Sequence, residues 1–380
     1  MDVKVRGIES LKGREVYITA SPDRSHPSLQ QAHEIFEGIR DALRKNGAWI
    51  CQERIFAPPE AVADLAKLRR QIYSDLDDGV PPTWLADTEF RGVQIYAISQ
   101  RHKPRVLCAQ GHPCGRLIKN NGCAWVTASA LPLLHANEPS PPTEETGPTQ
   151  TRLAFEQAES LLKQAGGDVK SVARTWFYLN HILDWYGTFN DTRSRFFTDR
   201  GLLAPGAGGK LPASTGMGVS PAGGARCSMD LIAVVGDPTC SRAPKGCALK
   251  HLAAGKQRSA YEYKSSFARA ATVCTPAGHT IFVSGTAAID PTGVTCHRSD
   301  IPGQIRMTLD CVNAVLSDLA CRQPDVVQAI AYCKTAQVEE FFEPWRQAID
   351  IPWTVVRGDV CRDDLLFEAE AVACRGARPF

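Results

Sequence analysis

The sequence predicts an α+β protein built from three fused, related units, because one pattern of strands and helices occurs three times. Each copy begins with an apolar run that ends in small hydroxylated residues: VYITAS from Val16, AWVTAS from Ala124 and IFVSGT from Ile281. The helix-like stretch after each run carries a glutamine twelve residues before a leucine, as in Gln31 and Leu43, Gln150 and Leu162, and Gln304 and Leu316. A repeat of this length indicates one supersecondary unit used three times.

Each copy continues with a second strand, a second helix and a last strand. The second strands are WICQERIF from Trp49, VARTWFYL from Val172 and VQAIAYCK from Val327. The last strands are VQIYAIS from Val93, MDLIAVVG from Met229 and FEAEAVA from Phe367. Amphipathic helices need one face of a sheet to lie on. We therefore expect β-β-α-β-α-β units with both helices on one side of a mixed sheet, and three sheets arranged edge to edge as a pseudo-trimer.

Polar, proline-rich and glycine-rich segments predict the boundaries. The expected units are a degenerate first unit, 1–104, a second unit, 105–245, and a complete third unit, 246–380, which carries the proposed catalytic residue. Two segments of the second unit, 137–149 and 204–211, are expected to be loops. Apolar residues at helical spacing predict helices over 28–45, 61–76, 305–320 and 338–349.

Composition excludes several classes of function. Lys and Arg number 43 against 41 Asp and Glu, a net charge of +2, so no broad field attracts nucleic acid or a membrane surface. No apolar run approaches the roughly 20 residues of a membrane span, and the first residues lack the apolar segment of a signal peptide. No His or Cys spacing typical of a metal site is present. We expect a cytoplasmic, cofactor-free protein whose 14 cysteines are reduced thiols.

Motifs in the second and third units resemble a known superfamily. FVSGTAAID from Phe282 and FEAEAVA from Phe367 are similar to the RidA/YjgF family, whose members are homotrimers with ligand sites between subunits. A closer resemblance is to the chorismatases, a larger branch that hydrolyses the enol-pyruvyl ether of chorismate. The motifs that carry it are RTWFYL from Arg174, YGTFNDTRSRFF from Tyr186, PASTGMG from Pro212, QRSAYEYKSSFARA from Gln257 and VCRDDLLFEAE from Val360. The resemblance covers most of residues 105–380 and implies a single-chain version of the trimer.

Glu368 is the candidate catalytic residue, because it matches the catalytic glutamate of the superfamily. Glu368 and Glu370 alternate with apolar residues along a strand, so both carboxyls should point to the face without helices. Alignment of the last strands places Gln94, Asp230 and Glu368 at one position in three related clefts. Cleavage of an enol ether begins with protonation of its terminal carbon. A carboxyl in a closed, mostly apolar cleft supplies that proton, since desolvation keeps it protonated near neutral pH.

A small anionic substrate with two carboxylates also needs guanidinium partners, because bidentate hydrogen bonds must replace the hydration lost in a dry cleft. Arg174 and Arg193, in two matching motifs, are the first candidates. Alternation along the strand is expected to put Val172, Arg174, Trp176 and Tyr178 on one face. Arg269 is a weaker candidate, either a ligand contact or a surface residue. Between residues 334 and 353, Lys334 and Arg346 are the substitutes for a second arginine that chorismatases carry there.

Further residues are expected to contact the substrate or to decide the product. Tyr178, Tyr261 and Tyr263 are candidates to hydrogen-bond a hydroxyl or a carboxylate of the substrate, or else pack with satisfied hydroxyls. In chorismatases, the residues that correspond to Ala270 and Cys361 help to decide between a dihydroxycyclohexadienoate and a hydroxybenzoate product. Alanine suits the first product and cysteine the second, so the resemblance leaves the product open.

Three functions therefore remain open at the level of the sequence. The first is chorismate hydrolysis to pyruvate. The second is a RidA-type imine or enamine deaminase, although Trp353 and Phe267 stand where those enzymes carry an arginine and a tyrosine. The third is a non-catalytic binder of small molecules on the same scaffold, since a fold does not fix a reaction. A ring closed within one chain predicts a monomer, with a dimer as the alternative.

Overall fold

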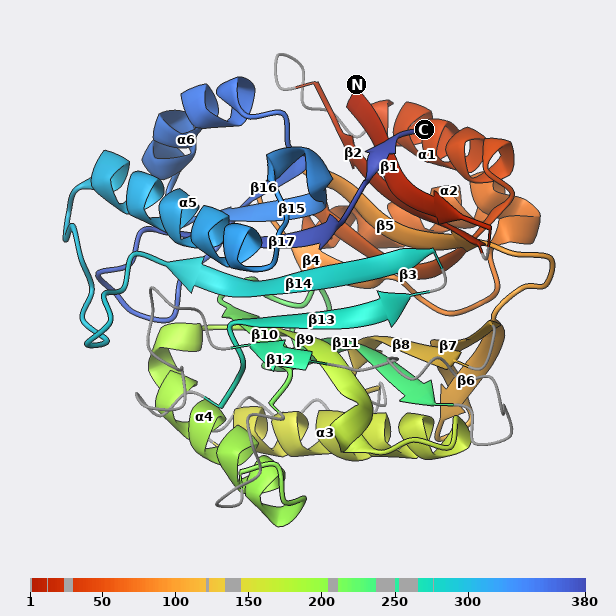
Figure 1. The fold of residues 1–380 in the computed structure, drawn as a ribbon, viewed down its shortest axis with the longest axis horizontal. Helices are drawn as coiled ribbons and strands as arrows, with labels where there is room; N and C mark the ends of the chain where they lie inside the picture. The colour runs from red at the N-terminus through yellow and green to blue at the C-terminus, as the bar shows by residue number, and fades with distance from the viewer. Residues whose placement is uncertain are drawn as a thin grey trace.

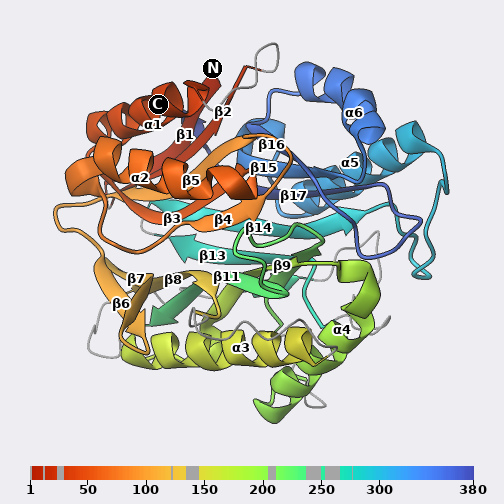
Figure 2. The same ribbon diagram turned by 180° about the vertical axis from the view of Figure 1, so that it is seen from behind.

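The computed structural model describes residues 2–11, 13–23, 30–120, 123–133, 145–203, 211–236, 250–252, 266–275 and 277–380. In this part of the chain, six α-helices accompany three six-stranded sheets, one for each unit (Figure 1). The helices lie on the outside of the molecule, and the sheets face one another inside it, as the view from behind also shows (Figure 2). The predicted α+β class and the three fused units are confirmed.

The first unit contributes five strands to its sheet and has two helices. They are β1 (Asp2–Ser10), β2 (Gly13–Ser21), α1 (Gln30–Lys45), β3 (Ala48–Ala57), α2 (Val62–Tyr73), β4 (Thr83–Ala86) and β5 (Gly92–Ser99). A short strand at the end of the chain, β18 (Arg378–Pro379), pairs with β1 and completes this sheet. The first unit is therefore joined directly to the C-terminal residues of the third.

The other two units repeat this plan. The second contains β6 (Arg105–Ala109), β7 (His112–Asn120), β8 (Cys123–Leu131), α3 (Thr146–Gln164), β9 (Val172–Leu179), α4 (Ile182–Asp199), β10 (Ala213–Met217) and β11 (Cys227–Gly236). The third contains β12 (Lys250–Leu252), β13 (Ala270–Thr275), β14 (Gly278–Ala287), α5 (Ile301–Asp318), β15 (Val326–Cys333), α6 (Ala336–Ala348), β16 (Trp353–Arg357) and β17 (Phe367–Cys374).

Strand order is the same in the three sheets. It reads β1-β2-β5-β3-β4, β7-β8-β11-β9-β10 and β13-β14-β17-β15-β16, with β18, β6 and β12 added at the outer edges. In each unit a short strand runs parallel to the strand between the two helices, here called the third strand. The pairs are β4 with β3, β10 with β9 and β16 with β15. The predicted motif lacked this strand, which the sequence indicates clearly only in the third unit. Its position matters because it lines the clefts described below.

Two expectations about loops and helices need correction. Residues 146–149, predicted to be loop, form the first turn of α3, while most of that segment and residues 204–210 lie outside the described residues. The predicted helices in the first and third units are present with ends displaced by a few residues. The helix α5 begins four residues earlier than expected because the Asp300 side chain caps it, accepting a hydrogen bond from the backbone N–H of Gly303.

Each sheet has two different faces. The helix-covered faces form three separate cores, one for each unit. The opposite faces share one central core, to which Tyr17, Trp176, Phe282 and Tyr332 contribute from all three units. One unit alone would leave that second apolar face exposed, so the three units stabilise one another.

The register of the sheets corrects the predicted alignment. A β-bulge interrupts each third strand, at Cys51, Ala173 and Val327. Three residues beyond each bulge, the strand pairs with Gln94, Asp230 and Glu370, respectively. The positions that match Glu368 are Gly92 and Ser228. Counted from these bulges, Gln94 and Asp230 match Glu370, two residues from the predicted match with Glu368. Side chains alternate with a period of two along a strand, so a slide of two leaves the apolar pattern unchanged.

These three equivalent residues tie the units together. Gln94 Nε2 in the first unit donates to a backbone carbonyl of β15 in the third, at 3.0 Å. Asp230 in the second unit accepts from Arg54 Nε of the first, at 2.9 Å. Glu370 in the third unit accepts from Arg174 Nη2 of the second, at 2.7 Å. Each unit reaches one neighbour in the same sense of rotation, so the ring closes within one chain.

The repeated glutamines hold the last strands in place. Gln304 Oε1 accepts from the backbone N–H of Leu366, at the start of β17, and Gln150 Oε1 accepts from those of Arg226 and Cys227, at the start of β11. The twelve-residue spacing to a buried leucine places this amide at one end of the helix and the apolar contact at the other. In these two units the repeated glutamine therefore has a structural role beside the last strand.

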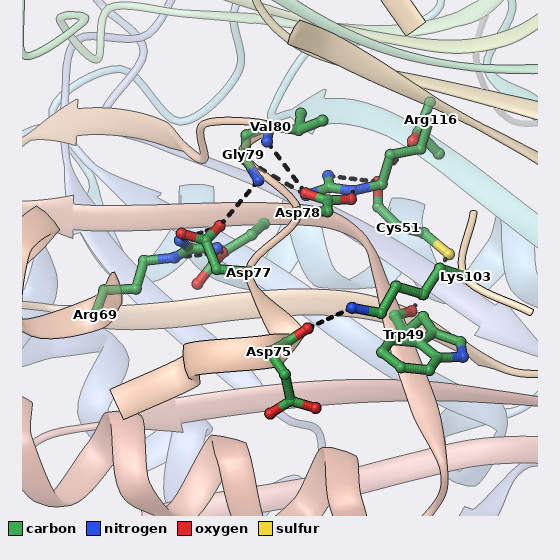
Figure 3. Close-up of polar contacts among 12 residues, drawn as sticks. Trp49, Cys51, Arg69, Asp75, Asp77, Asp78, Gly79, Val80, Lys103 and Arg116 are labelled. Atoms are coloured by element: carbon green, nitrogen blue, oxygen red, sulfur yellow. Dashed lines mark hydrogen bonds and ion pairs between the residues drawn. The ribbon is translucent and has the colours of Figure 1, made fainter. Parts of the chain in front are cut away.

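A buried ion pair also joins the first unit to the second. Arg116 of β7 donates to both carboxylate oxygens of Asp78, at 2.6 and 2.7 Å, and to the carbonyl of Cys51 at the β3 bulge, at 3.2 Å (Figure 3). The loop that carries Asp78 follows α2. Because the bidentate pair is planar and directional, it fixes this loop against the neighbouring sheet.

Two further features of the described residues bear on function. None of the helices there is both long and apolar enough to cross a lipid bilayer. No group of three or more His, Cys, Asp or Glu side chains in that part of the chain is arranged to hold a metal ion.

Candidate active site

Glu368 lies at the start of β17, in a cleft between the second and third units. Its strand neighbours Phe367 and Ala369 belong to the helix-covered core, so Glu368 points to the other face, as predicted. Gly285 leaves room for the carboxyl: a Cβ at this position would lie only 2.0 Å from Glu368 Oε1. A side chain at residue 285 would therefore displace the carboxyl from its present position.

The carboxyl of Glu368 is held in its protonated form near neutral pH. Burial raises its pKa to about 8, and repulsion from Glu370 adds to the effect, while Arg269 and Arg174 act in the opposite direction. Only 6% of the residue is exposed. Within the described residues, no hydrogen bond or ion pair involves this carboxyl. Glu368 is therefore a neutral acid at pH 7, with a proton available for transfer.

Glu370 differs sharply from its neighbour two residues away. It accepts from Arg174 Nη2 and, at 2.8 Å, from Trp176 Nε1. The same Nη2 of Arg174 also contacts the hydroxyl of Thr215 on β10, and that hydroxyl accepts from the backbone N–H of Gly285. Arg174, only 1% exposed, is thus a structural link beneath the cleft rather than one of the residues that line it.

The cleft around Glu368 is small and rich in arginine. In the described part of the chain it encloses about 50 Å³. Its lining combines α4 and β10 of the second unit with β14, β17 and two loops of the third, and comprises Tyr186, Arg193, Ser214, Gly216, Phe267, Arg269, Gly285, Ala287, Ile289, Cys361, Arg362 and Glu368. Three cations therefore face one neutral carboxyl, which gives the site a positive charge.

Arg193 and Arg269 both lie close to one aromatic ring. Their guanidinium carbons are 5.6 and 5.3 Å from the centre of the Phe267 ring, respectively. Arg193 is also held by Asn190 Oδ1 at 2.6 Å, while its buried Nε has no hydrogen-bond partner among the described residues. Burial lowers the pKa of Arg269 to about 10, although Glu368 opposes the shift, so this guanidinium remains charged at pH 7. The arrangement is suited to an anion.

The remaining polar side chains of the cleft are neutral or partly exposed. Burial raises the pKa of Cys361 to about 12, so this residue is a thiol and not a thiolate nucleophile. Burial likewise raises the pKa of the Tyr186 hydroxyl. Arg362, which is half-buried, donates to the carbonyl of Gly293 at 2.8 Å and so is held at the edge of the cleft. Among the described side chains that line the cleft, Glu368 is thus the one whose pKa suits it to donate a proton near neutral pH.

The structure brings together some of the predicted site residues and separates others. Glu368, Arg193 and Cys361 line one cleft. Tyr178 is buried in the central core, and Ala270 packs in the helix-covered core of the third unit, so neither lines it. Tyr261 and Tyr263 lie outside the described residues.

The predicted alternation along β9 is interrupted at its start. The bulge at Ala173 turns Val172 towards the helix-covered core of the second unit, whereas Trp176 and Tyr178 lie in the central core. Val172 therefore does not share a face with Arg174, as the sequence had suggested. A bulge inserts one residue and reverses the alternation beyond it, which a simple period of two cannot anticipate.

The arginines that accompany Arg193 in the cleft are Arg269 and Arg362, and not the expected substitutes Lys334 and Arg346. Lys334 pairs with Asp359 at 3.8 Å and Arg346 with Glu343 at 2.7 Å, and neither lines the cleft around Glu368. Arg269, expected to be a weak candidate or a surface residue, is 4% exposed and does line it, as does Arg362. Tyr186, Arg269 and Arg362 all stand in the quoted motifs, which was the available signal.

Comparisons with known proteins agree with this architecture. A crystal structure of a chorismatase aligns with a TM-score of 0.64 at 15% identity, over 98% of this chain and 100% of that chain. The YjgF gene product of E. coli aligns with 33% of this chain and 98% of its own, at 24% identity and a TM-score of 0.26. A YjgF-family protein of Mycobacterium tuberculosis covers the same shares at 22% identity and a TM-score of 0.27. The sequence matches no protein-family model and no curated protein.

Proposed function

We propose that the chain, which shares its fold with a chorismatase over 98% of its length, hydrolyses the enol-pyruvyl ether of chorismate, or of a close cyclic analogue, with release of pyruvate. The observation that carries this proposal is the neutral carboxyl of Glu368, whose pKa is raised to about 8 beside an arginine-rich cleft. Most carboxyls are ionised at pH 7 and have no proton to give. A carboxyl kept neutral by burial is suited to general acid catalysis at that pH.

The proposed reaction needs one proton donor and one water molecule. Glu368 transfers its proton to the terminal CH₂ carbon of the enol ether, forming a C–H bond and leaving an oxocarbenium ion. The new carboxylate stabilises that cation. Water adds to the cationic carbon and returns a proton to Glu368. Glu368 then donates its regained proton to the ether oxygen and takes up the hemiketal hydroxyl proton, while the bond between the hemiketal carbon and the ether oxygen breaks to give pyruvate and a dihydroxycyclohexadienoate.

The arginines of the cleft supply the binding energy for an anionic substrate. Arg193, Arg269 and Arg362 outnumber the single neutral acid, so two substrate carboxylates find cationic partners. Arg193 and Arg269 come from different units and lie near the same ring, so substrate binding would bridge the two units. Arg174 supports the site indirectly, because its pair with Glu370 fixes the strand that carries Glu368.

The size of the cleft adds a requirement. Ligand sites usually enclose about 300–1,000 Å³, several times the 50 Å³ found here. Entry of a cyclic dicarboxylate therefore requires side chains at the edge to move. Arg362 is half-buried and sits at that edge, so its rotation away from the carbonyl of Gly293 would open the cleft. Closure behind the substrate would exclude bulk water, retain the one reacting water molecule and keep Glu368 protonated.

Incubation of the purified protein with chorismate tests this function. Pyruvate is measured by its reduction with lactate dehydrogenase and NADH, against a blank that corrects for spontaneous decay of chorismate. The expected result is enzyme-dependent release of pyruvate that Glu368→Gln removes. Release that is equal in both proteins, or absent from both, would contradict the proposal. Ammonia release from 2-iminopropionate in place of pyruvate from chorismate would support the deaminase alternative.

A further inference from the structure

A second cavity, separate from the cleft around Glu368, lies in the described part of the chain. It encloses about 740 Å³ between the third and first units, and its lining runs from β1, β2 and the loop before β5 to α6 and β16. This volume lies in the range of about 300–1,000 Å³ that is usual for small-molecule sites. Nothing in the proposed reaction uses it.

This cavity corresponds to the cleft around Glu368 by the internal symmetry of the chain. Thr215 of β10 and Thr354 of β16 occupy equivalent positions. Each pairs with the residue that lies three positions beyond the bulge in the adjoining strand. The flanking residues Ser214 and Gly216 line the Glu368 cleft, and Trp353 and Val355 line the larger cavity. At the position of Glu368, however, the first unit has Gly92. The cavity thus lacks the acid that the smaller cleft contains.

Three residues in the lining of this cavity have polar atoms without a hydrogen-bond partner. Trp353 Nε1, Arg91 Nη2 and Thr19 Oγ1 are buried, and none of them has a partner among the described residues. The residues are 5%, 9% and 3% exposed, respectively. Unpartnered buried donors are uncommon in native structures and suggest a missing acceptor. A ligand oxygen in the cavity, reached by a small rotation of these side chains, would supply it.

The charge and apolar surface of the cavity narrow the class of ligand. Its lining contains six carboxylates and four cations, a net charge of −2, so it favours a positive group. Glu339 is the most buried of the acids that pair there, accepting from Arg91 Nη1 at 2.7 Å and from Arg357 Nε at 3.2 Å. Phe90 and Ile351, both nearly buried, add apolar wall next to the Trp353 ring.

From these features we propose that the cavity between the third and first units binds an α-amino acid with an apolar side chain, without catalysing its reaction. The carboxylate of the ligand accepts from the unpartnered donors, its ammonium group faces the carboxylates of the lining, and its side chain packs on the apolar wall. This second site is independent of the reaction proposed for Glu368. Its test therefore stands whatever chorismate assays show.

Calorimetric titration with three compounds tests the proposal. L-Phenylalanine has the carboxylate, the ammonium group and an apolar ring, whereas 3-phenylpropionate lacks the amine and 2-phenylethylamine lacks the carboxylate. We expect L-phenylalanine to bind with a Kd below about 1 mM and each analogue to bind at least about tenfold more weakly. The proposal is overturned if L-phenylalanine does not bind at millimolar concentration, or if either analogue binds equally well.

Two variants locate the binding within the molecule. Trp353→Phe keeps an apolar ring against Phe342 but removes the indole donor, and Thr19→Val removes the hydroxyl. Each should weaken L-phenylalanine binding by about threefold to tenfold. Trp84→Phe is the matched control, because Trp84 of β4 does not line this cavity, and it should leave the affinity unchanged. If all three variants bind L-phenylalanine as tightly as the wild type does, the ligand binds elsewhere and the proposed site is refuted.

Discussion

The joint between the first and second units and the cleft between the second and third units each contain a buried carboxyl, but the two are treated differently. Asp230 in the joint accepts from Arg54 Nε, the Thr83 hydroxyl and the backbone N–H of Ala130. Glu368 in the cleft has no such donor among the described residues. A carboxyl with all its acceptors used holds structure together, whereas one left neutral beside a cleft is available for chemistry.

The same comparison can be made along one strand. Glu370 corresponds to Asp230 and has the same structural role, since it accepts from Arg174 and Trp176. Glu368, two residues earlier, corresponds to Ser228 in the second unit and Gly92 in the first. The inter-unit contact is therefore kept at all three joints. The position of Glu368, by contrast, carries a carboxyl only in the third unit. Under the proposed function, this difference explains why one cleft of a symmetric scaffold would react and the others would not.

The largest effect is expected in the joint. Asp230→Ala leaves the buried guanidinium of Arg54 without its partner, so the free energy of unfolding should fall by about 3–5 kcal/mol in urea titrations. Ser228→Ala, on the same strand, is the matched control and should change it by less than about 1 kcal/mol. A loss below about 1 kcal/mol for Asp230→Ala would mean that this ion pair is not what ties the two units together.

In the cleft, the corresponding change should affect turnover rather than stability. Glu368→Gln preserves the size of the side chain but removes the transferable proton, so kcat for pyruvate release should fall at least about 100-fold, or about 2.7 kcal/mol. Substrate binding, measured by calorimetry, should be retained. Glu156→Gln, an exposed change on α3, serves as the control. Retention of full turnover by Glu368→Gln would exclude this residue as the acid.

The pH dependence of the reaction should follow the same group. Only protonated Glu368 donates, so kcat/KM should be flat below pH 8 and fall about tenfold per pH unit above it. Steady-state rates between pH 6 and 10, in buffers of constant ionic strength, would measure this limb. A decline that begins near pH 5 would instead indicate an ordinary ionised carboxyl.

A smaller effect is expected on stability. The folded-state pKa of Glu368 is raised from 4.5 to about 8, so the native state keeps a proton that the unfolded state loses. Below pH 4.5 both states are protonated and the group has no effect. Stability then falls as pH rises from 4.5 to 8. Glu368→Gln removes that loss, so its unfolding free energy should exceed that of the wild type by at least about 1 kcal/mol at pH 9, but not at pH 4.

Much of the fold follows from the sequence because the repeat carries structural information. Gln150 and Gln304 recur since their amides bond the backbone at the start of the last strands, and the spacing to a buried leucine orients each helix. The alignment of the last strands could not be fixed in the same way. Glu368 and Glu370 point to the same face, so alternation alone does not tell which of them matches Asp230.

The candidate site was predicted less completely than the fold. The motif resemblance identified Glu368 and Arg193, which do share a cleft. It did not reveal that Arg174 forms an ion pair with Glu370. A bond between residues 196 positions apart depends on how two units pack together. Burial of Arg269 likewise depends on how the segment around Phe267 packs against the second unit. Local periodicity carries no information about such contacts.

The central claim is that one carboxyl in the cleft stays protonated at neutral pH, and a direct titration tests it. Protein labelled with ¹³C at the glutamate side-chain carboxyls is titrated by NMR, and comparison with Glu368→Gln identifies the resonance of Glu368. The account predicts that this resonance titrates near pH 8, while exposed glutamates titrate near pH 4.5. Titration of the Glu368 resonance near pH 4.5 would contradict it and remove the proton on which the proposed chemistry depends.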